Sequence, residues 1–414
     1  MSSAALAVLV ASLSVGPTPP ARRIVVAPDG PVPTVSAALR LARAGDTIAV
    51  TAGVYREPRI EVGVSVTLLG VGAAILDGGG DHDVLSVRAD GVTIRGLTIR
   101  NVAPSYVEDR AGIRLDGVHG CVVEDNLLLD TFFGIYAGRS SGCIIAGNRI
   151  EGHARRQTAA GNAIHLFAST GFTVTGNRIS GHRDGIYLEF SPHAVIADNE
   201  SRQNLRYGLH FMFSDSCEYR HNRFEQNVSG VAVMYSHRVA MIGNRFEDNW
   251  GPAAYGLLLK EIKDSRVERN LFVRNTVGLY AESADRVVVT GNQFVRNGWA
   301  VRLMADATDS EFRHNRFVGN TFDVATNSRS SSPSTFAENY WDGYEGYDLD
   351  RDGVGDVPFR PVRLASVLVE QNAPMLILLH SFFLDLLEVA ERLMPVLTPD
   401  GLVDRRPLMH WRSS

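Results

Sequence analysis

Cysteine, long uncharged stretches and excess basic charge are all scarce in this sequence of 414 residues. Its three cysteines are too few for a disulfide framework, so packing and hydrogen bonds must hold the fold together. The formal net charge of −5 argues against non-specific binding of nucleic acid, because such binding needs a basic surface. Beyond the N-terminal segment every stretch long enough to span a bilayer contains a charge, which predicts no membrane-spanning helix there.

The N-terminus carries a short apolar run from Ala4 to Val15, followed by a segment with three prolines. We predict that residues 1–21 are a leader for export, with Ser14 and Gly16 as the small residues of a cleavage site. Secretory leaders usually place a Lys or Arg before the apolar run, and none is present here. A plain apolar tail is therefore the alternative.

A repeat of about 22 residues dominates the rest of the chain. Each unit has a glycine, a short apolar stretch, a polar turn and an asparagine, with a second asparagine five residues later in many units. This period, with apolar triplets between turns, predicts an all-β, right-handed parallel β-helix of the pectin-lyase-like kind. A leucine-rich repeat has a similar period but needs several leucines per unit. The glycines are Gly112, Gly134, Gly185, Gly208, Gly230, Gly256 and Gly278, and the first asparagines are Asn126, Asn148, Asn177, Asn199, Asn222, Asn244, Asn270, Asn292, Asn315 and Asn339.

Stacked coils place equivalent residues in columns about 4.8 Å apart. The second asparagines repeat on successive units, so we interpret them as a structural ladder at a corner rather than a binding site. They are Asn204, Asn227, Asn249, Asn275, Asn297 and Asn320. The three cysteines also occupy equivalent positions, which predicts buried packing residues; a disulfide between Cys121 and Cys143 is the lesser alternative.

The predicted organisation has five parts. Residues 1–21 are the leader, 22–80 the N-terminal cap and first coils, 81–345 the repeats, 346–361 an Asp-rich loop and 362–414 a helical extension. A short helix from Thr34 to Ala44, with Thr34 as N-cap, is expected to cover the open end of the solenoid.

Two columns of residues are predicted to face solvent, at the second and fourth positions after each repeat glycine. The surface they form has more large apolar groups than an ordinary solvated face. The first column contains His165, Tyr187, His210, Ala232, Leu258, Tyr280 and Arg302, and the second contains Phe167, Glu189, Met212, Met234, Lys260, Glu282 and Met304.

His210, Met212 and Met234 cluster within these columns. Thioether and imidazole donors suit Cu(I) and suit Mg²⁺ or Ca²⁺ poorly, which makes these three residues a candidate copper site. A methionine-rich surface that docks a partner protein without metal is the alternative, because methionine adapts to many partners.

A second candidate metal site is the loop that contains Asp348, Asp350, Asp352 and Asp356. Alternating aspartates followed by Gly353 resemble the first half of a Ca²⁺ loop. The bidentate glutamate of an EF-hand is replaced by Phe359, so the loop is either a shorter Ca²⁺ or Mg²⁺ site or a polar turn.

Residues Met375–Met394 have the periodicity of an amphipathic helix, interrupted by charged residues. Such a helix could pack on the end of the solenoid, dock a membrane partner, or lie at the membrane surface as a peripheral attachment.

Several longer stretches resemble the NosD family, whose members are accessory factors for the maturation of nitrous oxide reductase. The resemblance covers nearly the whole chain after the leader. The stretches that carry it are DGIYLEFS (184–191), NLRYGLHFMFSD (204–215), GVAVMYS (230–236), AAYGLLLKE (253–261), NYWDGYEGYDLDRDGVGDVPFRP (339–361) and PMLILLHSFF (374–383).

The resemblance implies a periplasmic, non-enzymatic protein that works with the permease and ATPase of an ABC transporter, a copper chaperone and the nitrous oxide reductase apo-enzyme. The role implied is assembly of the copper–sulfur centre of that reductase. On this basis His210, Met212 and Met234 become a candidate face for copper or for the chaperone, and the C-terminal helix becomes a candidate contact with the permease.

A carbohydrate-active lyase, hydrolase or epimerase is the main alternative, because such enzymes share the β-helix fold. It would need converging carboxylates in a groove. Asp184 and Glu189 are the nearest outward acids in the central repeats, and they do not form such a pair. A passive, adhesin-like solenoid is the third reading, and the non-repeating chemistry between His210 and Met234 argues against it.

Overall fold

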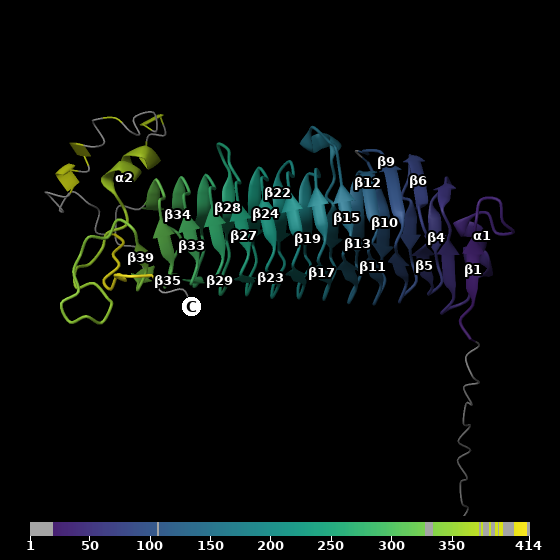
Figure 1. Cartoon of the computed structure of the whole chain (residues 1–414), viewed down its shortest axis with the longest axis horizontal. Helices are drawn as coiled ribbons and strands as arrows, with labels where there is room; N and C mark the ends of the chain where they lie inside the picture. The colour runs from purple at the N-terminus through teal and green to yellow at the C-terminus, as the bar shows by residue number, and fades with distance from the viewer. Residues whose placement is uncertain are drawn as a thin grey trace, which may run out of the picture.

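The structure is a computed structural model that describes residues 20–105, 107–327, 334–371 and 401–411, with 374–375, 381, 386–387 and 389–391 between them. Its central part is an elongated solenoid of stacked coils (Figure 1). Three parallel sheets run along it, and each regular coil contributes one strand to each sheet in turn. The predicted parallel β-helix is confirmed.

The first sheet has 14 strands, all parallel. They are β1 Arg23–Val26, β2 Thr47–Val50, β5 Thr67–Gly70, β8 Thr93–Arg95, β11 Val122–Glu124, β14 Ile144–Ala146, β17 Thr173–Thr175, β20 Val195–Ala197, β23 Glu218–Arg220, β26 Ala240–Ile242, β29 Arg266–Glu268, β32 Val288–Thr290, β35 Glu311–Arg313 and β38 Thr335–Ala337.

The second sheet has 13 strands. They are β3 Gly53–Tyr55, β6 Ala74–Gly80, β9 Thr98–Val102, β12 Leu127–Thr131, β15 Arg149–Glu151, β18 Arg178–Ser180, β21 Glu200–Arg202, β24 Arg223–Glu225, β27 Arg245–Glu247, β30 Leu271–Val273, β33 Gln293–Val295, β36 Arg316–Val318 and β39 Tyr340–Trp341.

The third sheet has 12 strands and carries the candidate copper residues. They are β4 Ile60–Val62, β7 Leu85–Val87, β10 Ala111–Asp116, β13 Phe133–Gly138, β16 Ile164–Phe167, β19 Asp184–Glu189, β22 Tyr207–Met212, β25 Ser229–Met234, β28 Tyr255–Lys260, β31 Val277–Glu282, β34 Trp299–Leu303 and β37 Phe322–Ala325.

Alternate residues of these strands fill one continuous core along the solenoid axis. The repeat glycines sit where coils approach most closely: a Cβ on Gly230 would lie 2.4 Å from the carbonyl oxygen of Gly256. The three cysteines are buried in this core and free, so the alternative of a disulfide is wrong.

Both asparagine columns form hydrogen-bonded ladders. In the first, the Oδ1 of Asn244 accepts from the backbone N–H and from the side-chain amide of Asn222, each at 3.0 Å. In the second, the Oδ1 of Asn227 accepts in the same way from Asn204, at 3.0 and 2.9 Å. The structural interpretation of the second asparagines is therefore confirmed.

The helix α1, Val35–Leu41, lies at the N-terminal end of the solenoid beside β1 (Figure 1). The Oγ1 of Thr34 accepts from the N–H of Ala37 at 3.1 Å, which confirms the predicted N-cap. The helix ends before the predicted Ala44, because Ala42 is extended and its N–H bonds the carbonyl of Leu39.

The C-terminal end is closed by two elements. The helix α2, Leu364–Gln371, packs Ala365 and Val369 on Phe322, and Glu370 accepts from Arg302 at 2.5 Å. The segment 401–411 was predicted to be helical, but it forms bridges to the last coil, such as Phe336 with Asp404.

Most of the predicted helix Met375–Met394 falls outside the described residues. Within the part of the chain that is described, no helix combines the length and apolar character needed to cross a membrane.

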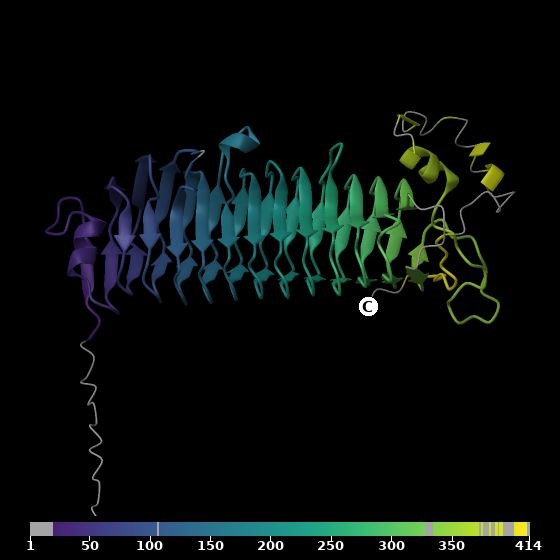
Figure 2. The ribbon, with the colours of Figure 1, turned by 180° about the vertical axis from the view of Figure 1, so that it is seen from behind.

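One coil carries an insertion that rises above the others in both views (Figures 1 and 2). It follows β15 and contains the short 3-10 helix η1, Gln157–Ala159.

Candidate functional site

The third sheet presents the candidate copper residues on its outer face. In β22 and β25 the residues Leu209, Phe211, Val231 and Val233 point into the core, so the alternate residues His210, Met212 and Met234 face away from it. Met212 and Met234 are register partners on adjacent coils, and His210 pairs with Ala232. The structure thus brings the two thioethers together and places His210 two residues from one of them.

The prediction that the first column points into solvent is wrong for most of its members. The side chains of Tyr187, His210 and Leu258 face away from the core, yet they are buried, and His210 is only 4% exposed. The reason is mutual stacking of rings on successive coils: the ring centroids of His165 and Tyr187 lie 4.8 Å apart, and those of Tyr187 and His210 lie 4.7 Å apart. Tyr207 covers His210 from the side, at 4.8 Å.

The ring of His210 sits against a buried ion pair. Its Nδ1 lies 3.2 Å from Nη2 of Arg206 and 3.7 Å from Oδ2 of Asp184. Burial alone would raise the pKa of Asp184, but the hydrogen bonds and charge of the Arg206 guanidinium, together with the neighbouring His210, lower it to about 2. Asp184 therefore stays ionised at neutral pH and is available to orient the imidazole.

The other ring nitrogen of His210, Nε2, is buried and has no hydrogen-bond partner. A buried polar atom without a partner is uncommon and costs free energy. The Nη2 of Arg206 can only donate, so at 3.2 Å it makes Nδ1 the acceptor and leaves the proton on Nε2. A metal ion can bind Nε2 only after this proton moves to Nδ1, toward Asp184.

The thioethers are half-buried and lie beside a hydroxyl group. The Oη of Tyr187 donates to the Sδ of Met212 at 3.3 Å, so this tyrosine connects the stacked rings to the methionines. The second column continues in register to Glu189 on one side and Lys260 on the other. Two thioethers and one imidazole on one face are donors that suit Cu(I).

An exposed aromatic ladder borders the methionines and was missed in the sequence. Phe190, Phe213 and Tyr235 stack with centroids 5.0 Å apart and interplanar angles of 7° and 14°. Phe190 and Phe213 are 49% and 42% exposed, and all three residues have left-handed backbones with φ near 50°. The signal was present in the sequence as an aromatic residue five positions after three successive repeat glycines.

The buried thiols do not contribute to this face. Burial raises the pKa of Cys217 to about 12, and its Sγ donates to the carbonyl of Ser191. The thiol is therefore protonated at neutral pH and belongs to the core.

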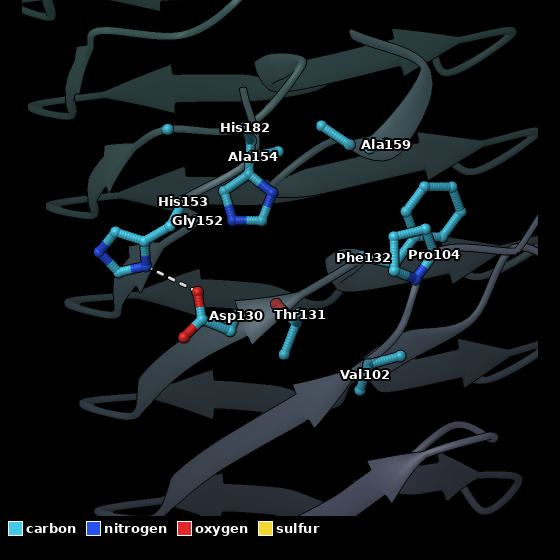
Figure 3. A pocket seen from close by; sticks show the side chains of 12 residues that line it. Val102, Pro104, Asp130, Thr131, Phe132, Gly152, His153, Ala154, Ala159 and His182 are labelled. Atoms are coloured by element: carbon cyan, nitrogen blue, oxygen red, sulfur yellow. Dashed lines mark hydrogen bonds and ion pairs between the residues drawn. The ribbon is translucent and has the colours of Figure 1, made fainter. Parts of the chain in front are cut away.

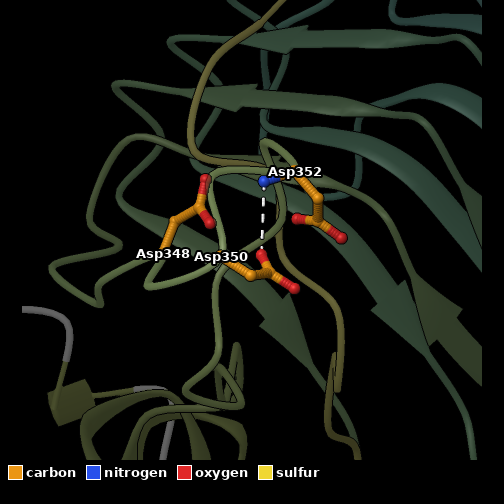
Figure 4. Close-up of side chains that lie close together, drawn as sticks. All are labelled: Asp348, Asp350 and Asp352. Atoms are coloured by element: carbon orange, nitrogen blue, oxygen red, sulfur yellow. Dashed lines mark hydrogen bonds between the residues drawn. The ribbon is translucent and has the colours of Figure 1, made fainter.

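The acidic loop brings three of its four predicted ligands together. The carboxylates of Asp348, Asp350 and Asp352 offer oxygen atoms within 4.8 Å of one another (Figure 4). Asp356 is not part of this group; its Oδ2 accepts from the N–H of Leu349 at 2.7 Å. The carboxylates also accept backbone N–H groups, for example Gly353 to Asp348 at 2.9 Å.

Comparisons with known proteins relate the chain to one family. Residues 150–346 match the family model described as periplasmic copper-binding protein (NosD). A probable ABC transporter binding protein NosD of Pseudomonas aeruginosa is 32% identical over 81% of this chain and 82% of its own length. The protein of the same name from Stutzerimonas stutzeri is 27% identical over 81% of this chain and 80% of its own length.

Among solved structures, the catalytic unit of a GH87 α-1,3-glucanase from Streptomyces thermodiastaticus superposes with a TM-score of 0.61. It is 15% identical and covers 82% of this chain and 71% of its own, so this likeness concerns the fold alone. The family description places its members in the periplasm, as predicted for this protein. Because the Pseudomonas aeruginosa protein is 32% identical over 81% of this chain, the chain belongs to the NosD family.

Proposed function

We propose that this protein is a non-catalytic periplasmic factor in the maturation of a copper enzyme, nitrous oxide reductase, and that it takes part in assembling the copper–sulfur centre. It would work with the permease and ATPase of an ABC transporter, a copper chaperone and the apo-enzyme. His210, Met212 and Met234 would hold Cu(I) in transit.

One observation carries the copper part of the proposal: a buried imidazole nitrogen without a partner lies on the same outer face as two adjacent thioethers. The family description as copper-binding supports it, and the names of the two relatives support an association with an ABC transporter. Asp184 and Arg206 would hold His210 in one orientation, and the proton of Nε2 would move to Nδ1, toward Asp184, when the ion binds.

The exposed ladder of Phe190, Phe213 and Tyr235 would be the surface on which the chaperone docks, because it borders the thioethers and offers large apolar groups to a partner. It suits a protein better than a polysaccharide. Sugars stack on the faces of aromatic rings, and here the ring faces are occupied by one another.

A carbohydrate-active enzyme has little support in the central coils. Asp184, one of its two candidate acids, is buried and its charge is matched by Arg206, so it is not available as a proton donor. Among the described residues, the one close group of three His, Cys, Asp or Glu side chains is Asp348, Asp350 and Asp352, in the exposed loop that follows the last coil and not in the central coils.

Complementation of a denitrifying bacterium that lacks its own member of this family tests the proposed function. We expect the wild-type chain to restore the copper–sulfur centre of the reductase, measured from its acid-labile sulfide and copper content. Met212→Leu/Met234→Leu should accumulate to the same level without restoring it. Met304→Leu, in the same column, should restore it. Full restoration by the double variant would contradict the role of these thioethers.

We also propose that the loop from Asp348 to Asp352 binds Ca²⁺ or Mg²⁺, because three carboxylates converge there and hard cations prefer oxygen ligands. Isothermal titration with Ca²⁺ should show one binding event that Asp350→Asn/Asp352→Asn abolishes. Asp356→Asn, outside the group, should bind as the wild type does. Equal binding by the double variant would exclude this site.

A further inference from the structure

One column of the solenoid changes its chemistry abruptly between the central and the N-terminal coils. From Asn204 onward this column is the second asparagine ladder, but in the four preceding coils it holds Val102, Thr131, His153 and His182. The register is set by the pairing of Thr131 with Val102 and by the N–H of His182, which donates to the Oδ1 of Asn204 at 3.2 Å. The second asparagine ladder therefore begins at Asn204, and other side chains occupy its column in the four coils before it.

A cavity of about 300 Å³ lies where the ladder stops (Figure 3). The insertion after β15 covers it, and two contacts hold that insertion to the solenoid: Nε2 of Gln157 donates to the carbonyl of Leu205 at 2.9 Å, and the N–H of Gly161 to that of Phe132 at 3.0 Å. Its walls are mostly apolar, with Val102, Pro104, Phe132, Ala154, Ala159 and Ala160.

Two buried polar atoms at this cavity lack partners. They are the Nε2 of His182, a residue only 1% exposed, and the Oγ1 of Thr131. In the downstream coils the asparagine amides at the same position are fully hydrogen-bonded. Leaving such atoms unsatisfied costs stability, and sites that depart from a repeating structural rule are often functional.

A second imidazole stands at the rim. His153 follows on the adjacent coil, and its Nδ1 lies 2.6 Å from Oδ1 of Asp130. This contact fixes the proton on Nδ1 and leaves Nε2 as the free lone pair, as in metal sites where a carboxylate orients a histidine ligand. The ring of His182 lies against Gly152, the residue before His153: a Cβ on Gly152 would approach its Cδ2 to 3.2 Å.

We propose that His153 and His182 form a third metal site, for a borderline divalent ion such as Zn²⁺ or Cu²⁺, with Asp130 orienting His153. Equivalent residues on adjacent coils lie about 4.8 Å apart, and imidazoles bind such ions at about 2.0–2.1 Å. The side chain of His153 is 73% exposed, so it would have to turn inward, with Asp130 following it, for both rings to reach one ion. The cavity lining holds neither thiol nor thioether, which separates this site from the Cu(I) donors of the third sheet. The Thr131 hydroxyl and water would complete the coordination.

Titration of the chelator-treated protein with Zn²⁺ against a chromogenic competitor, in excess Ca²⁺ to fill the acidic loop, tests this site. We expect one Zn²⁺ per chain, lost in His153→Asn and in His182→Asn. Asp130→Asn should weaken binding by about tenfold to hundredfold, the usual effect of losing an orienting partner. Cu²⁺ bound at the same site should show coupling to two nitrogens in its electron paramagnetic resonance spectrum.

Three variants separate loss of the proposed Zn²⁺ site from loss of the fold and from loss of the copper site. His182→Asn introduces the residue that occupies this column in the later coils. The variant should therefore fold, and its unfolding temperature should equal or exceed that of the wild type. His237→Asn removes a half-buried histidine whose Nδ1 also faces an aspartate, Asp215 at 3.3 Å, and it should bind Zn²⁺ normally. Met212→Leu/Met234→Leu should also retain Zn²⁺, which makes this inference independent of the proposed copper site. Absence of Zn²⁺ binding by the wild type, or unchanged binding by both asparagine variants, would overturn it.

Discussion

His210 has to be buried and still keep one nitrogen available. Stacked rings on the neighbouring coils exclude water from it, while the ionised Asp184 lies 3.7 Å from Nδ1. The Nη2 of Arg206 lies closer to Nδ1, at 3.2 Å, and can only donate, so Nδ1 accepts and the proton rests on Nε2. A metal ion at Nε2 therefore requires this proton to move to Nδ1, where the ionised Asp184 would stabilise it.

Asp184→Asn should destabilise the protein by about 3 kcal/mol at pH 7, because it leaves the partly buried Arg206 without its counter-charge. The lowered pKa means that Asp184 stabilises the fold above its ordinary value of 3.8 and loses that contribution as pH falls toward 2. The gap in unfolding free energy between wild type and variant should therefore narrow from pH 4 to pH 2. Urea unfolding at several pH values in this range measures the two unfolding free energies. A difference that stays constant would contradict the lowered pKa of Asp184.

For single residues, the sequence predicts the face on which a side chain lies better than it predicts which other side chains surround it. Spacing from the repeat glycines correctly placed His210, Met212 and Met234 on one outer face. It could not predict that His210 is buried, because the burial depends on rings supplied by other coils and on Tyr207. The sequence could not predict for the same reason that Nε2 of His182 is buried without a hydrogen-bond partner, since this depends on the cavity under the insertion.

Ladders and stacks are the elements that hold the coils together. Besides the two asparagine ladders, an internal stack of Phe246, Phe272 and Phe294 repeats at 4.6 and 4.7 Å. The asparagine ladders were predictable because their spacing is visible in the sequence. The register of these elements fixes where every outer side chain lies, so the candidate copper face depends on them.

Asn244→Ala should cost about 4 kcal/mol, because it leaves the backbone N–H and the amide of Asn222 buried without their acceptor, at about 1–3 kcal/mol each. Local hydrogen exchange should rise most at Asn222 and in the coils beside it. Gln203→Ala, which breaks an exposed side-chain pair with Gln226, serves as control and should change stability by less than about 0.5 kcal/mol. Equal effects of the two substitutions would show that the ladder contributes little.

On the scale of the whole molecule, the solenoid is closed at its C-terminal end by a distant part of the chain. Oδ2 of Asp404 accepts from the backbone N–H and amide of Asn339, both at 3.1 Å, and from Nε1 of Trp341 at 3.0 Å. A carboxylate thus ends the first asparagine ladder. This closure was not predictable, because residues 362–414 carry no repeat signal and the contact spans 65 positions in the chain.

Asp404→Ala should loosen the last coils and leave the first ones intact, since each coil of a solenoid contacts only its neighbours. Hydrogen exchange followed by mass spectrometry should show faster exchange around β36 to β39 and unchanged exchange before β20. Asp404→Asn keeps one oxygen acceptor and should have a smaller effect. Uniform loss of protection along the solenoid would contradict this local role.

Binding of Cu(I) by the third sheet is the central claim, and an anaerobic titration of the purified protein against a competing chelator tests it most directly. The wild-type chain and Met304→Leu should each bind one Cu(I) tightly, and Met212→Leu/Met234→Leu should lose that binding while keeping its fold. Absence of tight binding by the wild type, or equal binding by the double variant, would contradict the claim. The face of Met212 and Met234 would then be a docking surface without metal.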